Sequence, residues 1–131
     1  MPSNDVQDAG RLLRPLIGQG LNQLCVGAYD LQLHFDGGLS ITFETEVRRA
    51  DGAGVPVAPY TIEGLSLLVP LLNGNVTEAA VNGLGGLSLT IDRTELHCPS
   101  HPDFEAWNLT GPDGVLVVCT PGGDLAIWSA G

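Results

Sequence analysis

A run of alternating apolar and polar residues, interrupted by one tight turn, constrains this chain more than any other feature. The apolar positions are Leu31, Leu33 and Phe35 before the turn, and Leu39, Ile41 and Phe43 after it. Between them, Asp36 to Gly38 supplies the positive φ angles that a tight hairpin turn requires. Since successive side chains of a strand point to opposite faces, the pattern predicts an antiparallel hairpin with one buried face.

A second stretch repeats this pattern further along the chain, where residues 75–99 resemble residues 20–47. The matching positions are Leu87, Leu89, Ile91, Leu96 and Cys98, in the places of Leu31, Leu33, Phe35, Leu39 and Ile41. The offset between the two stretches changes only in turns, so the sequence predicts an internal duplication of a three-strand unit. Strand alternation by itself also produces some of these matches.

The remaining segments predict further strands and one or two short helices. Thr61 can cap a helix because leucines follow it at helical spacing, although Pro70 limits its length. Residues 115–119 and 125–128 predict a last hairpin through a Pro-Gly-Gly turn. Together the segments predict an antiparallel, β-rich α+β fold of about eight strands, curved into a sandwich or a partial barrel.

The length and the two ends of the chain bound its organisation. A chain of 131 residues has the usual size of one domain, so residues 1–131 are predicted to form a single domain. Residues 1–10 are polar and are predicted to be a disordered tail. The start lacks the basic head and the apolar stretch of a signal peptide, which predicts a cytoplasmic location.

The charge balance is strongly acidic, with fifteen Asp and Glu against five basic residues and a net charge of -10. Nucleic-acid binding proteins gain affinity by neutralising phosphates with Lys and Arg, so this balance argues against nucleic acids and anionic membranes as partners. No stretch approaches the roughly 20 apolar residues of a membrane span. The charge favours association with a basic protein, although a high net charge also serves solubility alone.

Residues 97–107, "HCPSHPDFEAW", hold most of the side chains capable of chemistry. Cys98 and His101 have a C-x-x-H spacing suited to zinc, but they supply two of the four ligands that a closed site needs. Alternation directs Cys98 into the core, where a thiol is a poor nucleophile because its pKa is raised. We therefore expect no metal and no cofactor.

The rest of this segment is predicted to be a connector. Pro99 and Pro102 interrupt regular structure. Residues 102–107 can form one helical turn, which would direct both Phe104 and Trp107 into the core.

The side chains left as candidates for a binding site are His34, His97, His101, Asp103 and Glu105. His97 and the three residues from the connector are predicted to lie exposed on one rim. His34 and His97 occupy equivalent outward positions of the two similar units, either as marks of one polar face or as ordinary surface histidines.

Three short segments carry a resemblance to a known family. They are Phe104 to Trp107, Gly111 to Gly114 and Pro121 to Trp128, in which the aromatic positions and a Pro-Gly-Gly turn occur in order. Over roughly residues 18–128 the chain resembles a family of small proteins of high-GC Gram-positive bacteria whose function is unknown. The resemblance implies a compact domain and supplies no catalytic or binding residues.

Two hypotheses about function follow. The first is a non-enzymatic interaction module that binds a basic protein, in the manner of an immunity protein or a regulatory binder. The second is a small-molecule binder or modest enzyme that uses a cavity in the curved sheet, with His34, His97 or His101 at its rim. Exposed sheet edges also allow self-association.

Overall fold

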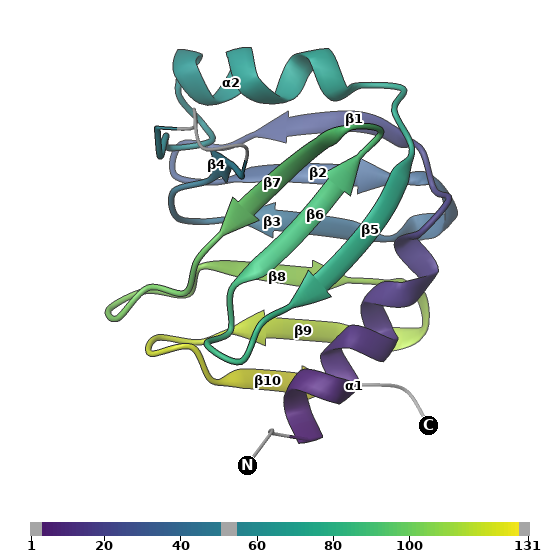
Figure 1. Ribbon diagram of the computed structural model, residues 1–131, viewed down its shortest axis with the longest axis vertical. Coiled ribbons are helices and arrows are strands. Elements are labelled where there is room, and N and C mark those ends of the chain that lie inside the picture. The colour runs from purple at the N-terminus through teal and green to yellow at the C-terminus, as the bar shows by residue number, and fades with distance from the viewer. Residues whose placement is uncertain (1–3, 51–54, 129–131) are drawn as a thin grey trace.

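The computed structural model describes residues 4–50 and 55–128, which form two antiparallel sheets and two α-helices (Figure 1). The helices are α1 (Asn4–Leu13) and α2 (Ile62–Leu68). The strands are β1 (Leu21–Val26), β2 (Leu31–Phe35), β3 (Ser40–Phe43), β4 (Arg48–Arg49), β5 (Val76–Val81), β6 (Leu87–Ile91), β7 (Thr94–Cys98), β8 (Trp107–Thr110), β9 (Leu116–Cys119) and β10 (Leu125–Trp128). Short 3-10 turns follow both helices.

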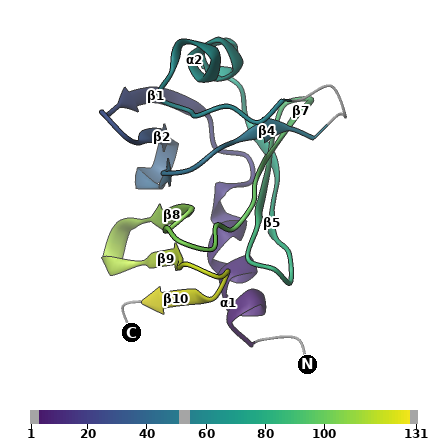
Figure 2. The same ribbon diagram turned by 90° about the vertical axis from the view of Figure 1, so that its left-hand side faces the viewer.

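The two sheets lie against each other in the manner of a sandwich. One has six strands in the order β1-β2-β3-β8-β9-β10, and the other has four in the order β4-β7-β6-β5. Figure 2 shows them as separate layers, with α1 and α2 at opposite margins of the space between them. The β-rich antiparallel class is confirmed. The first unit of the chain starts one sheet and the second unit starts the other, and among the described residues neither sheet closes into a barrel. The described residues form ten strands, where about eight were predicted.

The chain begins with a helix where a tail was predicted. Ala9, Leu13 and Leu16 are fully buried, and α1 packs against β5 and β10. The prediction of a disordered tail over residues 1–10 is therefore wrong for residues 4–10, while residues 1–3 lie outside the described residues. The apolar positions are too few to form a run, but at helical spacing they make a stripe that the two sheets bury.

The local predictions around turns and caps are confirmed. Gly37 and Gly38 have φ angles of 82° and 86° in the turn between β2 and β3. The Thr61 hydroxyl accepts a hydrogen bond of 3.2 Å from the Gly64 amide at the start of α2. Pro70 falls in the 3-10 turn that ends this helical segment.

The two similar units share details that simple alternation does not require. β1 has a bulge between Leu21 and Gln23 where it pairs with β2, and β5 has one at the corresponding place where it pairs with β6. The amide of Gly18 donates to the Val76 carbonyl at 2.8 Å, and the amide of Asn73 donates to the Leu21 carbonyl at 2.8 Å. Residues 18 and 21 of the first unit correspond to residues 73 and 76 of the second, so the two bonds are equivalent. An approximate twofold axis therefore relates the units.

The register of the third strands differs from the prediction. Cys98 pairs with Leu87 as Phe43 pairs with Leu31, so Cys98 takes the place of Phe43 and not that of Ile41. The turn between β6 and β7 is shorter than the one between β2 and β3, which shifts the correspondence.

The two units also exchange their next strands. After β3 the chain crosses to the four-stranded sheet, where β4 pairs with β7. After β7 it crosses back, and β8 pairs with β3. The crossing segments meet where the Glu44 amide donates to the Ala106 carbonyl at 2.9 Å. This exchange brings several loops together at one end of the molecule.

Candidate functional site

The two strand histidines lie on different faces of the molecule. His34 points outward from the six-stranded sheet, and its Nε2 lies 2.9 Å from Gln32 Oε1. His97 points outward from the four-stranded sheet, and its Nδ1 lies 3.5 Å from Ser88 Oγ. The idea that they mark one polar face is therefore wrong. Their positions are also not equivalent, because His34 lies on β2, which corresponds to β6, whereas His97 lies on β7. Each histidine points from the outer face of its own sheet, away from the other sheet.

The other three candidates lie in the connector between β7 and β8. His101 Nδ1 accepts a 3.0 Å hydrogen bond from the Asp103 amide, and the His101 ring lies 5.0 Å from the ring of Phe104, centroid to centroid. Glu105 lies near Glu44 at the crossing of the chain. His101, Asp103 and Glu105 therefore lie together in the connector. His97 lies on β7, the strand that precedes the connector, and faces outward from the four-stranded sheet.

Phe104 and Trp107 behave differently, although both were predicted to be buried. Trp107 is fully buried and starts β8, but Phe104 is 62% exposed and no helical turn forms here. The reason is the path of Ala106, whose amide donates to the Cys119 carbonyl at 3.1 Å while its carbonyl accepts from Glu44. These bonds hold the connector extended and leave Phe104 on the surface.

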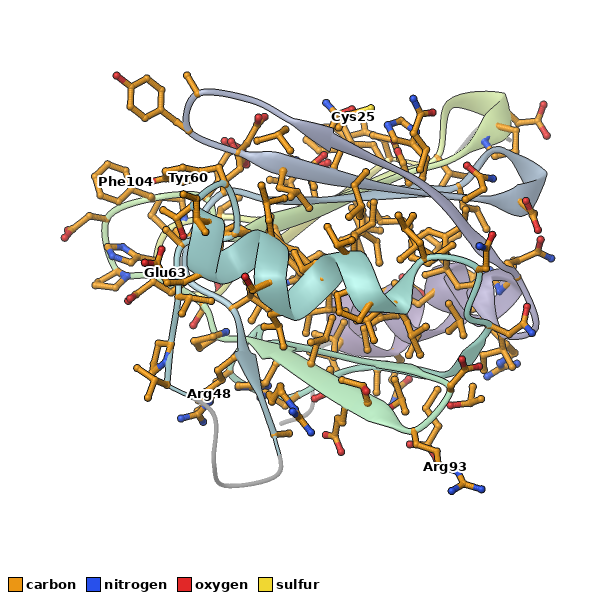
Figure 3. The ribbon with its side chains drawn as sticks, turned by 90° about the horizontal axis from the view of Figure 1, so that it is seen from above. Cys25, Arg48, Tyr60, Glu63, Arg93 and Phe104 are labelled. Carbon is orange, nitrogen blue, oxygen red and sulfur yellow. The ribbon has the colours of Figure 1, made fainter. Side chains whose placement is uncertain are left out.

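Acidic and aromatic side chains from four segments gather at the end where the chain crosses between the sheets. We call this the acidic end, and its residues are Asp30, Glu44, Glu63, Asp103 and Glu105 together with Tyr29, Tyr60 and Phe104. The rings of Tyr29 and Tyr60 meet edge to face, with centroids 6.4 Å apart. Figure 3 shows Tyr60, Glu63 and Phe104 at this end, and Arg93 far from it. Periodicity missed most of these residues because all of them except Glu63, which is in α2, lie outside helices and strands.

The electrostatics at this end are unfavourable to further negative charge. The pKa of Glu44 is raised, first by its burial and then by the carboxylates of Glu105 and Asp30, while a hydrogen bond with Asn108 opposes the rise. Neighbouring carboxylates repel one another, which favours either protonation of one of them or the binding of a cation. A positively charged ligand would relieve the repulsion.

Two of the three cysteines are buried and are therefore poor nucleophiles. Cys98 is buried, as predicted, and burial raises its pKa to about 12. Burial also raises the pKa of Cys119, whereas Cys25 is half-buried on the outer face of β1.

We expect a thiol reagent to modify these three cysteines unequally. In the native protein, Cys25 should react first, and Cys98 and Cys119 should react only on unfolding, because their thiolates are disfavoured and covered. Mass spectrometry of native and urea-treated protein after iodoacetamide treatment measures this order. Rapid native modification of Cys98 would contradict it.

Other kinds of site have little support among residues 4–50 and 55–128. There, no three His, Cys, Asp or Glu side chains are grouped to hold a metal. Neither described helix is long and apolar enough to cross a membrane. Two surface grooves of about 400 Å³ each run along the helices, and no histidine lines either of them.

Comparison with known proteins relates the chain to a family but assigns it no function. The sequence profile of a family of unknown function (DUF6188) matches residues 12–129. Searches of curated proteins and of solved structures found no match.

Proposed function

The chain belongs to this family of unknown function, DUF6188, and we propose that it is a non-enzymatic binding module whose acidic end receives a basic segment of a protein partner. One observation carries the proposal: exposed aromatic rings stand among the carboxylates of the acidic end. Carboxylates attract Lys and Arg, and aromatic faces bind the same cations.

The aromatic residues separate this proposal from simple solubility. Charged side chains alone would keep the protein in solution. They do not account for Tyr29, which is 81% exposed, or for Phe104. Large exposed rings within a polar rim are typical of the anchors of protein interfaces. A partner would cover these rings and neutralise part of the charge.

The alternative, a small-molecule binder or enzyme with a histidine-bordered cavity, lacks such an observation. His34, His97 and His101 lie in three separate places, and the raised pKa of Cys98 argues against a thiol nucleophile.

Affinity capture with matched variants tests the proposal. Wild-type protein and the variants Phe104→Ser and Trp128→Ser are immobilised, and proteins captured from the native lysate are quantified by mass spectrometry. Trp128 is a half-exposed aromatic residue on β10, outside the acidic end, and serves as the control. We expect a basic protein whose capture falls about tenfold with Phe104→Ser and is retained with Trp128→Ser.

A second pair of variants tests the charge. Glu105→Gln should weaken capture at low salt, while Glu78→Gln on the outer face of β5 should not. Repeated recovery of the bait alone would refute the proposal. So would a captured protein that binds the Phe104→Ser variant as well as wild type.

A further inference from the structure

A groove between α1 and β5 carries two of the five arginines of the chain. It has a volume of about 400 Å³, and we call it the arginine groove. Its lining residues are Gln7, Gly10, Arg11, Arg14, Ile17, Ala79, Ala80 and Val81. From its guanidinium groups and its apolar floor, we infer that the arginine groove binds a small organic anion with an apolar tail. This site is distinct from the acidic end.

The cationic wall of the groove is available for a ligand. Arg11 makes a single 3.3 Å contact with Asp8, and both side chains are largely exposed, so this ion pair is weak. The side chain of Arg14 has no hydrogen bond or ion pair among the described residues. A guanidinium fork fits the two oxygens of a carboxylate or phosphate group. Arg14 is therefore the expected anchor of the anionic head.

Apolar side chains of the lining suit an apolar tail. Ile17 is 48% exposed, and β5 contributes Ala79, Ala80 and Val81 to the lining. Gly10 leaves the helix side open, since a Cβ built there would meet nothing within 4 Å. The volume falls in the lower part of the range for small-molecule pockets.

The second unit of the fold shows that the arginines are not needed to make a groove. A groove of the same volume runs along α2, lined by Ile62, Leu65, Ser66, Val69 and Pro70. Under the twofold that relates the units, Ser66 takes the place of Arg11 and Val69 the place of Arg14. The α2 groove has no basic side chain in its lining and still forms. The two arginines thus determine the chemistry of the first groove and not its existence.

The protein as a whole repels anions, which makes the expected binding diagnostic. With a net charge of -10, a general attraction for negative ligands is absent. Saturable binding of an anion must therefore come from a local site.

The test is a titration of the whole protein with four probes, followed by NMR amide shifts and calorimetry. Octanoate and octyl phosphate carry the two possible head groups on one tail, octanol carries the tail without charge, and inorganic phosphate carries charge without the tail. We expect octanoate or octyl phosphate to saturate with shifts in α1 and β5, and the better of the two identifies the head group. We expect octanol and inorganic phosphate to bind at least about tenfold more weakly.

Arginine variants decide whether the arginine groove is responsible. Arg14→Gln should weaken binding at least about tenfold, and Arg14→Lys should weaken it less, because the charge remains while the fork is lost. Arg93→Gln, in the turn between β6 and β7, removes the same charge elsewhere and should leave binding unchanged. Thermal melting of each variant confirms that it is folded.

Four results would overturn the inference. They are the absence of saturable binding up to about 10 mM, equal losses in the Arg14 and Arg93 variants, binding of octanol as tight as that of the better anion, and a concentration-dependent oligomer that Arg14→Gln dissociates. The last result would assign the groove to an acidic segment of a second copy.

Discussion

Replacing Trp107 with alanine is expected to destabilise the protein by about 3 to 5 kcal/mol. Trp107 has the largest fully buried side chain among the described residues, and it pairs with Phe43 where β8 joins β3. Its indole Nε1 donates a 2.9 Å hydrogen bond to the carbonyl of Gly85, in the turn between β5 and β6. The substitution would leave a cavity between the sheets and deprive that buried carbonyl of its donor.

Phe104→Ala is the matched control, since it removes a large aromatic side chain three residues away. Because Phe104 is mostly exposed, its loss should change the free energy of unfolding by no more than about 0.5 kcal/mol. Urea unfolding followed by circular dichroism measures both variants. Equal destabilisation by the two substitutions would show that Phe104 is packed in the core.

Gly85→Ala is expected to destabilise the protein by about 2 to 5 kcal/mol. Gly85 has a φ of +87°, which an alanine adopts only with strain. Its Cβ would also lie against the carbonyl of Gly123, far inside van der Waals contact, and the atoms that it would meet belong to the backbone. Relief requires movement of the turn, which would also displace the carbonyl that Trp107 bonds.

Gly122→Ala separates the two causes. Gly122 has a similar φ of +90°, but a Cβ there would meet nothing within 4 Å. The cost should be the backbone strain alone, about 1 to 2 kcal/mol. The difference between the two unfolding free energies in urea then measures the steric clash. If both glycine variants lose the same stability, the turns of residues 82–86 and 120–124 are not in close contact.

The features that the sequence predicted correctly depend on neighbours along the chain. Alternation identified the hairpin of β2 and β3, and the spacing after Thr61 identified α2. The inward position of Cys98 followed from the same alternation. Such patterns are local, because they reflect which side chains of one strand or helix share a face.

Features that depend on distant segments could not be read in the same way. The helix at Asn4–Leu13 exists because β5 and β10 bury its apolar stripe. Phe104 is exposed because bonds from Glu44 and Cys119 fix the connector at Ala106. No local pattern contains these partners, which lie far away in sequence.

The candidate binding surfaces also depend partly on local sequence and partly on tertiary structure. The sequence by itself determined the excess of carboxylates, the scarcity of basic residues and the repetition of a three-strand unit. Only the tertiary structure separated His34 from His97, gathered loop residues at the acidic end and placed Arg14 beside β5. The physical reason is that a strand pattern fixes which face a side chain takes, whereas the pairing of strands from both units fixes which faces meet.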